Sequence, residues 1–266
     1  MYAIDFEYDG IRLSDYGMMI CSFDKGGGLE TVFSGADLTF NTVKTTGSDI
    51  FRFYGAKYEE SYSTTFQICK NDCYSSKNYF NPLEVSSLQR WLCRKDGFHE
   101  FKIIQNDYVD IHWKATFSAK QIVLGGKIIG MELTLHTDSP YAYGNEQSVT
   151  FSLTNGGKVF SLYDQNDEVG YTYPTVTINA FEDGRLNIAN SLNPKVTQLT
   201  ITAGNVITLN GANKTITYSD SSNKKDFNFI FPKLVNTFDN RENLITLLGA
   251  DCNVTFSYYP KIKIGL

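Results

Sequence analysis

Apolar and polar residues alternate along several short segments in the first half of the chain, with the two-residue period of a half-buried β-strand. The predicted inward-facing sets are Tyr2, Ile4, Phe6 and Tyr8; Tyr62, Thr64, Phe66 and Ile68; Trp113, Ala115 and Phe117; and Met131, Leu133 and Leu135. Asp9-Gly10 and Gly125-Gly126 lie between apolar runs and predict tight turns. The first half is therefore predicted to be mainly β.

One segment has the helical period instead. Asn81 is a suitable N-cap, Pro82 suits the first helical position, and Glu84 completes a capping box. The apolar residues Val85, Leu88, Trp91 and Leu92 fall on one helical face, and Gly97 is a stop signal. We predict a single helix near residues 82–95, with its apolar stripe packed on a sheet.

The second half is a succession of short predicted strands. Their alternating residues are Val176 and Ile178; Leu199 and Ile201; Val206 and Thr208; Ile216 and Tyr218; Phe227, Phe229 and Phe231; and Val254, Phe256 and Tyr258. Strands at this spacing, separated by Gly- and Asn-containing turns, indicate a β-sandwich. Pro140 and Gly144 punctuate the chain between the halves. The predicted domains are residues 1–142 and 143–266.

Composition narrows the function classes. The chain has 266 residues, 42% hydrophobic and 14% aromatic, with a formal charge of -5. This is too apolar for a disordered chain, and the acidic balance disfavours nucleic acid as a partner. No apolar run approaches the length of a membrane-spanning helix, and the N-terminus lacks the pattern of a signal peptide. We expect neither nucleic-acid binding nor membrane insertion.

The five cysteines, at 21, 69, 73, 93 and 252, are an odd number, which disfavours a disulfide framework. Free thiols in a reducing compartment are the simpler interpretation. A zinc site made of Cys69, Cys73, Cys93 and His99 has acceptable ligand types, but its spacing is loose. We therefore predict no metal or other cofactor and leave this set as the alternative.

Catalytic patterns are missing from the sequence. No Gly-x-Ser-x-Gly nucleophile elbow is present, and His99, His112 and His136 have no partner motif. The alternation around Trp113 predicts that His112 faces the surface or an interface. Gly26-Gly27-Gly28 lacks the context of a phosphate loop. The acidic loop with Asp164, Asp167 and Glu168 fits a solvated surface better than a hydrolase or calcium site. We predict that the protein is not an enzyme.

Four tyrosines near the predicted domain join are the candidate contact residues. Tyr141, Tyr143, Tyr171 and Tyr173 are aromatic groups of the kind that bind sugars or fill protein interfaces. Their rings could contact a glycan, or they could seal the contact between the two domains.

With these elements in order, the chain resembles the distal tail protein family of long-tailed, non-contractile bacteriophages. The resemblance rests on the opening strand with Gly10-Ile-Arg-Leu-Ser-Asp-Tyr-Gly-Met18, the helix ending Leu88-Gln-Arg-Trp-Leu92, the segment from Met131 to Gly144, and the closing run from Phe231 to Pro260. It covers nearly the whole chain in element order.

The resemblance implies an N-terminal β-sandwich or barrel-like domain that forms a ring, typically of six subunits, at the tail tip. It also implies a galectin-like or carbohydrate-module-like C-terminal β-sandwich. The expected partners are the tail tube protein and a tail-associated, fibre or receptor-binding protein. Assembly would take place in the cytoplasm of the bacterial host, for an infecting phage or a prophage. The main alternative is a carbohydrate-binding module that recognises host surface glycans, and a wall hydrolase is a third class.

Overall fold

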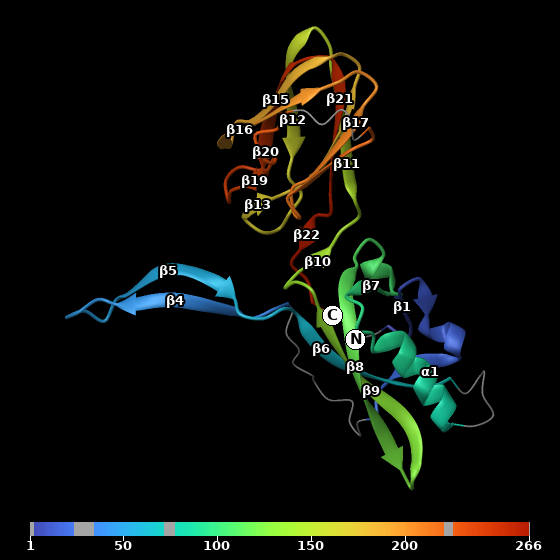
Figure 1. The fold of residues 1–266 in the computed structure, drawn as a ribbon. Helices are drawn as coiled ribbons and strands as arrows, with labels where there is room; N and C mark the ends of the chain where they lie inside the picture. The colour runs from blue at the N-terminus through green and yellow to red at the C-terminus, as the bar shows by residue number, and fades with distance from the viewer. Residues whose placement is uncertain (1–2, 24–34, 72–77, 221–225, 266) are drawn as a thin grey trace. The chain divides into compact units, whose positions relative to one another are not determined.

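The computed structural model describes residues 3–23, 35–71, 78–220 and 226–265. The chain forms two compact units (Figure 1). The N-terminal unit comprises Met1–Tyr143 and Ile262–Leu266, and the C-terminal unit comprises Gly144–Lys261. The sequence-based division at residue 142 did not assign the last residues of the chain to the first unit. The short strands β10 (Ala142–Tyr143) and β22 (Lys261–Ile262) lie where the chain passes from one unit to the other.

An antiparallel seven-stranded sheet forms most of the N-terminal unit. Its strands lie in the order β2 (Ile11–Arg12), β1 (Phe6–Tyr8), β7 (His99–Ile103), β8 (Trp113–Leu124), β9 (Lys127–Thr137), β6 (Ser63–Lys70) and β3 (Met18–Cys21). Two 3₁₀ helices, η1 (Leu13–Tyr16) and η2 (Asn106–Tyr108), lie in its connections. A separate hairpin contains β4 (Leu38–Lys44) and β5 (Phe51–Tyr58).

The turn predictions are confirmed. Asp9 and Gly10 connect β1 to β2 with φ values of 52° and 76°, and Gly125 and Gly126 connect β8 to β9 with 58° and 77°. Positive φ at both central residues is typical of two-residue hairpin turns, because the twist of such a turn matches the twist of the two strands that it connects.

The α-helix α1 (Pro82–Leu92) begins as predicted. The Asn81 side chain accepts hydrogen bonds from the N–H groups of Leu83 and Glu84, and Glu84 Oε2 accepts one from the Asn81 N–H at 2.8 Å. This capping box satisfies N–H groups that have no partner within the helix. The helix ends at Leu92 rather than near 95, because Cys93 has left the helical conformation.

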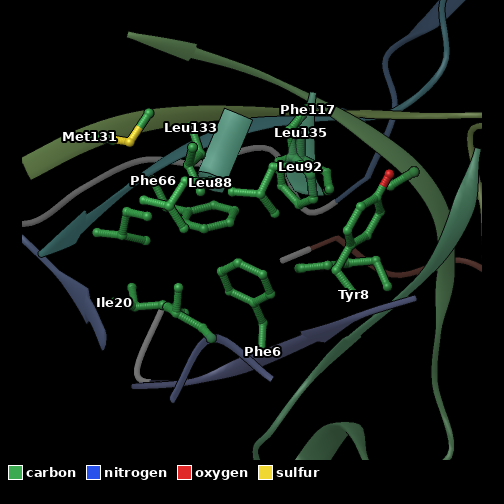
Figure 2. Packing of buried hydrophobic residues seen from close by; sticks show 14 of the residues in the cluster. Phe6, Tyr8, Ile20, Phe66, Leu88, Leu92, Phe117, Met131, Leu133 and Leu135 are labelled. Atoms are coloured by element: carbon green, nitrogen blue, oxygen red, sulfur yellow. The ribbon is translucent and has the colours of Figure 1, made fainter. Parts of the chain in front are cut away.

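The apolar stripe of α1 packs into the N-terminal core as predicted (Figure 2). Leu88 and Leu92 lie near Phe66 and Phe117. This core also contains the alternating residues of β8 and β9 and, from β6, Phe66 and Ile68, whereas Thr64 is only half-buried. The first predicted set was partly wrong. Phe6 and Tyr8 are buried, but Ile4 is 66% exposed because it precedes β1 and takes no part in the sheet alternation. Tyr2 lies outside the described residues.

The C-terminal unit is a β-sandwich, as predicted. One sheet has the order β11 (Gln147–Leu153), β21 (Cys252–Tyr258), β14 (Thr175–Ala180), β17 (Val206–Asn210) and β18 (Thr215–Tyr218). The other has the order β12 (Gly156–Tyr163), β20 (Glu242–Gly249), β15 (Gly184–Asn190) and β16 (Asn193–Ile201). Residues of both sheets, such as Ile178 and Leu247, share one core. A short pair, β13 (Gly170–Thr172) and β19 (Leu234–Asn236), completes the unit.

One predicted strand of this unit was wrong. Residues Phe227, Phe229 and Phe231 alternate with polar residues, yet they form no strand. Phe227 makes only an isolated bridge to Leu199, and Phe229 has a φ of 55° that a regular strand does not allow. Backbone hydrogen bonds hold the segment beside β16: the Thr200 N–H donates to the Asp226 carbonyl at 2.9 Å, and the Asn228 N–H donates to the Gln198 carbonyl at 3.0 Å. Within the segment, the Phe227 ring packs against both Phe229 and Phe231 with centroids 5.2 Å apart.

Candidate functional site

The β4–β5 hairpin carries an exposed apolar surface. Among the described strands, β4 and β5 pair only with each other. Phe40 and Phe53 are 62% and 64% exposed, and their ring centroids are 6.3 Å apart. Leu38, Val43, Ile50, Phe51 and Tyr54 are also exposed. Large clustered apolar groups on a strand pair with unpaired edges are typical of a surface that another chain covers.

A β-bulge distorts this hairpin near its middle. The register shifts between Asn41, which pairs with Gly55, and Thr42, which pairs with Phe53. Tyr54 is consequently the extra residue, and Gly55 adopts a φ of 129°. A bulge increases the local twist of a strand pair and changes the direction of its side chains. This hairpin was not predicted, although Phe51 and Phe53 alternate with polar residues and Gly47 supplies a turn signal.

Tyr141 packs beside the end of this hairpin. Its ring makes an edge-to-face contact with that of Tyr58, the last residue of β5, at a centroid distance of 5.3 Å. Tyr141 therefore has a structural partner within the N-terminal unit.

Tyr143 also has its contacts within the N-terminal unit. Its hydroxyl donates to the carboxylate of Asp138 at 3.2 Å, and its ring lies 5.8 Å from that of His112. Burial, together with the charge of Asp138, raises the pKa of the Tyr143 phenol to about 12. The backbones of Tyr143 and His112 are joined by hydrogen bonds in both directions, at 2.7 and 2.9 Å.

This pairing corrects the prediction for His112. The residue is only 8% exposed, so of the two predicted positions, at the surface or at an interface, the surface position was wrong. His112 lies just before β8, and its backbone forms a separate bridge to Tyr143, whose ring covers it. Burial lowers the pKa of its imidazole.

Tyr171 and Tyr173 lie in the C-terminal unit, each beside a lysine. The Lys233 ammonium is 4.4 Å from the centre of the Tyr171 ring, and the Lys214 ammonium is 3.2 Å from that of Tyr173. The two tyrosines were predicted as contact residues, but the two lysines were not. The structure thus places the four candidate tyrosines as two pairs, one in each unit.

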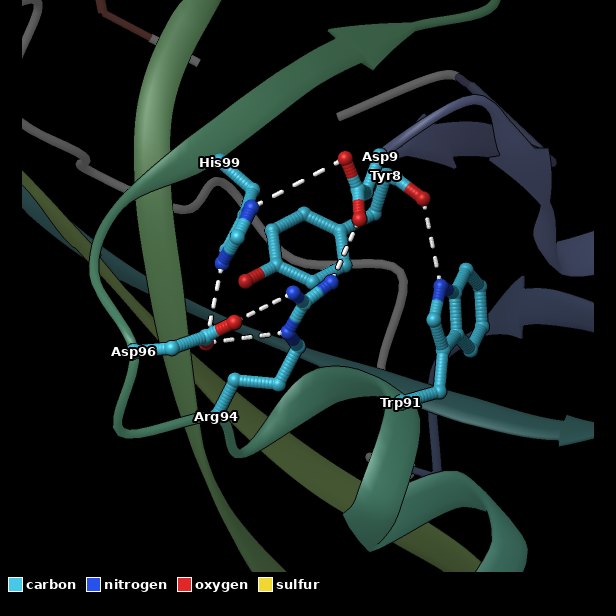
Figure 3. Close-up of polar contacts among 6 residues, drawn as sticks. All are labelled: Tyr8, Asp9, Trp91, Arg94, Asp96 and His99. Carbon is cyan, nitrogen blue, oxygen red and sulfur yellow. Dashed lines mark hydrogen bonds and ion pairs between the residues drawn. The ribbon is translucent and has the colours of Figure 1, made fainter.

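A polar network joins the β1–β2 turn to the residues after α1 (Figure 3). Arg94 forms ion pairs with Asp9 and Asp96, and His99 Nε2 is 3.1 Å from Asp96 Oδ1. The Arg94 guanidinium and the His99 ring hold the pKa of Asp96 well below its usual range. Trp91 Nε1 donates to the Tyr8 carbonyl at 3.1 Å. These contacts link the β1–β2 turn to the residues after α1 and engage the carboxylates of Asp9 and Asp96.

The zinc alternative gains no support from the described residues. Cys21, Cys69, Cys93 and Cys252 are free thiols there, and Cys73 lies outside them, as does the Gly26–Gly28 run. Within the described ranges, no three His, Cys, Asp or Glu side chains are grouped so that they could hold a metal ion. His99 instead contacts the two carboxylates of the polar network. No helix in the described part of the chain is long and apolar enough to cross a membrane.

Family models identify the class of protein. Residues 1–139 match the phage tail protein N-terminal domain, and residues 141–258 match the phage tail C-terminal domain. Together these matches cover most of the chain, which therefore belongs to this phage tail protein family. The expected family resemblance is thereby confirmed at the level of a phage tail protein.

A solved structure has the same fold. The Dit protein of phage SPP1, described as a paradigm of the hub adsorption apparatus in phages that infect Gram-positive bacteria, superposes with a TM-score of 0.62. The match covers 96% of this chain and 98% of that protein at 13% sequence identity. No curated protein sequence matches the chain at a significant level.

Proposed function

We propose that this protein is a structural, non-catalytic hub at the tip of a long, non-contractile phage or prophage tail. Six copies form a ring that joins the tail tube protein to the fibre or receptor-binding apparatus. Membership of the phage tail family supports the location in the virion. The fold shared with SPP1 Dit, itself described as part of a hub adsorption apparatus, supports the specific position.

The exposed apolar surface of the β4–β5 hairpin is the main support for the proposed ring. When one surface of a subunit contacts a different surface of the next identical subunit, the assembly closes into a ring if the rotation between neighbours divides a full turn. The hairpin supplies one such surface, because it exposes Phe40 and Phe53, and its edges pair with no other described strand of the chain. In the proposed ring, a neighbouring copy covers these residues and pairs with one edge.

The test is the mass of the full chain in solution, measured by light scattering and native mass spectrometry. We expect a species of six times the 30.0 kDa chain mass. The double variant Phe40→Ser/Phe53→Ser should dissociate to smaller species, because each substitution removes about 2 kcal/mol of apolar burial from every interface. Val159→Ser, which changes a similarly exposed apolar residue of β12, should leave the ring intact.

Two outcomes would contradict the proposal. A wild-type chain that stays monomeric at micromolar concentration, with no rings in negative-stain images, would rule out the ring. A double variant that keeps the wild-type mass would rule out the hairpin as the contact surface. Tryptophan fluorescence checks folding of the variants, since both tryptophans, Trp91 and Trp113, are buried in the N-terminal unit.

A further inference from the structure

Four residues from three segments of the C-terminal unit form what we call the lysine–tyrosine patch: Tyr171, Tyr173, Lys214 and Lys233. Pairing of β13 with β19 sets Tyr171 opposite Val235 and so brings it near Lys233. Pairing of β14 with β17 brings Tyr173 to the turn that contains Lys214, where a Cβ on Gly211 would lie 2.9 Å from that of Tyr173. The patch is therefore positioned by strand pairing on both sides.

The two ammonium groups converge on one ring. Lys214 Nζ and Lys233 Nζ lie 3.2 and 5.6 Å from the centre of Tyr173. Within the described residues, neither lysine forms a salt bridge with a carboxylate. Partial burial alone would raise the pKa of the Tyr173 phenol, but the two lysines lower it overall. The patch thus concentrates positive charge on a chain whose net charge is negative.

The backbone at Lys214 is costly for a lysine. Its φ of 56° lies in the left-handed region that favours Gly and Asn, and the preceding residue of the turn is Asn213. Residues held in such conformations cluster at sites of function. Asn or Gly would adopt this conformation at lower cost, so the turn itself does not require a lysine at this position.

Tyr171 gives the patch a second kind of contact. The residue is 61% exposed, which leaves aromatic surface available to a ligand beside the Lys233 ammonium. A neutral sugar could pack on the ring but would leave both ammonium groups without an anion. A simple inorganic anion would use the lysines but not the ring. A ligand with both sugar rings and negative charges uses all four residues.

We propose that the lysine–tyrosine patch binds an acidic polysaccharide, with a sugar ring against Tyr171 and carboxylates accepting hydrogen bonds from Lys214 and Lys233. This site lies entirely within the C-terminal unit and does not depend on the proposed ring. It assigns the ligand-binding role to the lysines as well as to the tyrosines, and it makes anionic charge the requirement for recognition.

Calorimetric titration of the full chain with oligogalacturonate tests the proposal. The variants Lys214→Asn, which suits the left-handed turn, and Lys233→Gln should each weaken binding about tenfold or more, because each removes a charge-assisted hydrogen bond. Tyr171→Ala should weaken it as well. The matched control is Lys158→Gln, which removes an ammonium lying 5.1 Å from the centre of the Phe160 ring in the same unit. It should bind like the wild type.

Two further probes separate sugar from charge. A neutral maltooligosaccharide of the same length and a polyaspartate of the same charge should both bind much more weakly than oligogalacturonate. The proposal is overturned if the wild type does not bind oligogalacturonate, if polyaspartate binds equally well, or if Lys158→Gln weakens binding as much as the patch variants. The oligomer mass, measured on the same samples, tests the proposed ring independently of polysaccharide binding.

Discussion

Asn243 bonds both backbone groups of Val235 in the C-terminal unit. Its Oδ1 accepts from the Val235 N–H at 2.8 Å, and its Nδ2 donates to the Val235 carbonyl at 3.1 Å. The same Oδ1 accepts from Asn190 Nδ2 at 2.7 Å, and the Asn243 side chain is fully buried. The Asn243 side chain thereby bonds the backbone of β19 as a neighbouring strand would, and it joins β19 to β20.

We predict that Asn243→Ala destabilises the C-terminal unit by more than about 2 kcal/mol, because it leaves several buried polar groups without partners. Hydrogen exchange of peptides from β19 and β20 should show faster exchange. The exposed Asn213→Ala is the control and should change protection little. Equal protection in Asn243→Ala and the wild type would show that the amide is dispensable.

Asp164 should make the C-terminal unit less stable as pH rises. The solvated position expected for this residue was wrong: Asp164 is fully buried, and burial raises the pKa of its carboxyl. A raised folded-state pKa means that stability is fully present below the unfolded value of about 3.9 and is lost as pH rises through the folded-state pKa. Asp164→Asn should remove this loss and raise the melting temperature at pH 7 relative to the wild type. Calorimetry at several pH values measures it, with the exposed Asp239→Asn as control.

His112 should make the N-terminal unit less stable as pH falls. Burial is the main cause of its lowered pKa, to which the charges of Lys102 and Lys114 add, whereas Glu100 and Asp138 oppose them. A lowered folded-state pKa means that stability is present above the unfolded value of about 6.5 and is lost as pH falls below it.

Urea unfolding followed by tryptophan fluorescence reports the N-terminal unit, where both tryptophans lie. His112→Gln should flatten the dependence of its stability between about pH 6.5 and pH 5. The exposed His136→Gln should keep the wild-type dependence. If the stability of His112→Gln and that of the wild type change with pH in parallel, His112 is not the cause of the pH dependence.

Gly249 is predicted to be irreplaceable at the end of β20. Its φ is 131°, and a Cβ there would lie 1.8 Å from the Arg185 carbonyl oxygen. Gly249→Ala should cost about 3 kcal/mol or more, because it adds backbone strain to a clash with backbone atoms.

Hydrogen exchange in β15 and β20 measures this loss. Gly157→Ala is the matched control in the same sheet, since its Cβ would meet only the movable end of Leu248, at 3.1 Å, and a distant carbonyl. Similar exchange in the two variants would contradict the steric argument.

Local signals were sufficient for several elements. Asn81 and Glu84 define the start of α1 because their hydrogen bonds involve only neighbouring residues. Gly125 and Gly126 define a turn because few other residues adopt positive φ. Alternation predicted the buried residues of β6, β8, β9, β14 and β21, since one face of each lies on a core.

Longer-range contacts decided the rest. Phe229 and its neighbours alternate like a strand, but their rings pack on one another and the segment pairs only at Phe227. His112 is buried because Tyr143, distant in sequence, pairs with it. Phe40 and Phe53 are of a residue type that is usually buried. They are exposed because their strands pair with no described strand other than each other.

The sequence by itself determined the β class, the single helix, the two-part organisation of apolar segments and the family resemblance, because these follow from local periodicity and element order. Only the tertiary structure decided which aromatic residues stay exposed and which lysines meet Tyr171 and Tyr173. Strand pairing brings Lys214 and Lys233 to those rings from separate segments, and no short-range pattern encodes that proximity.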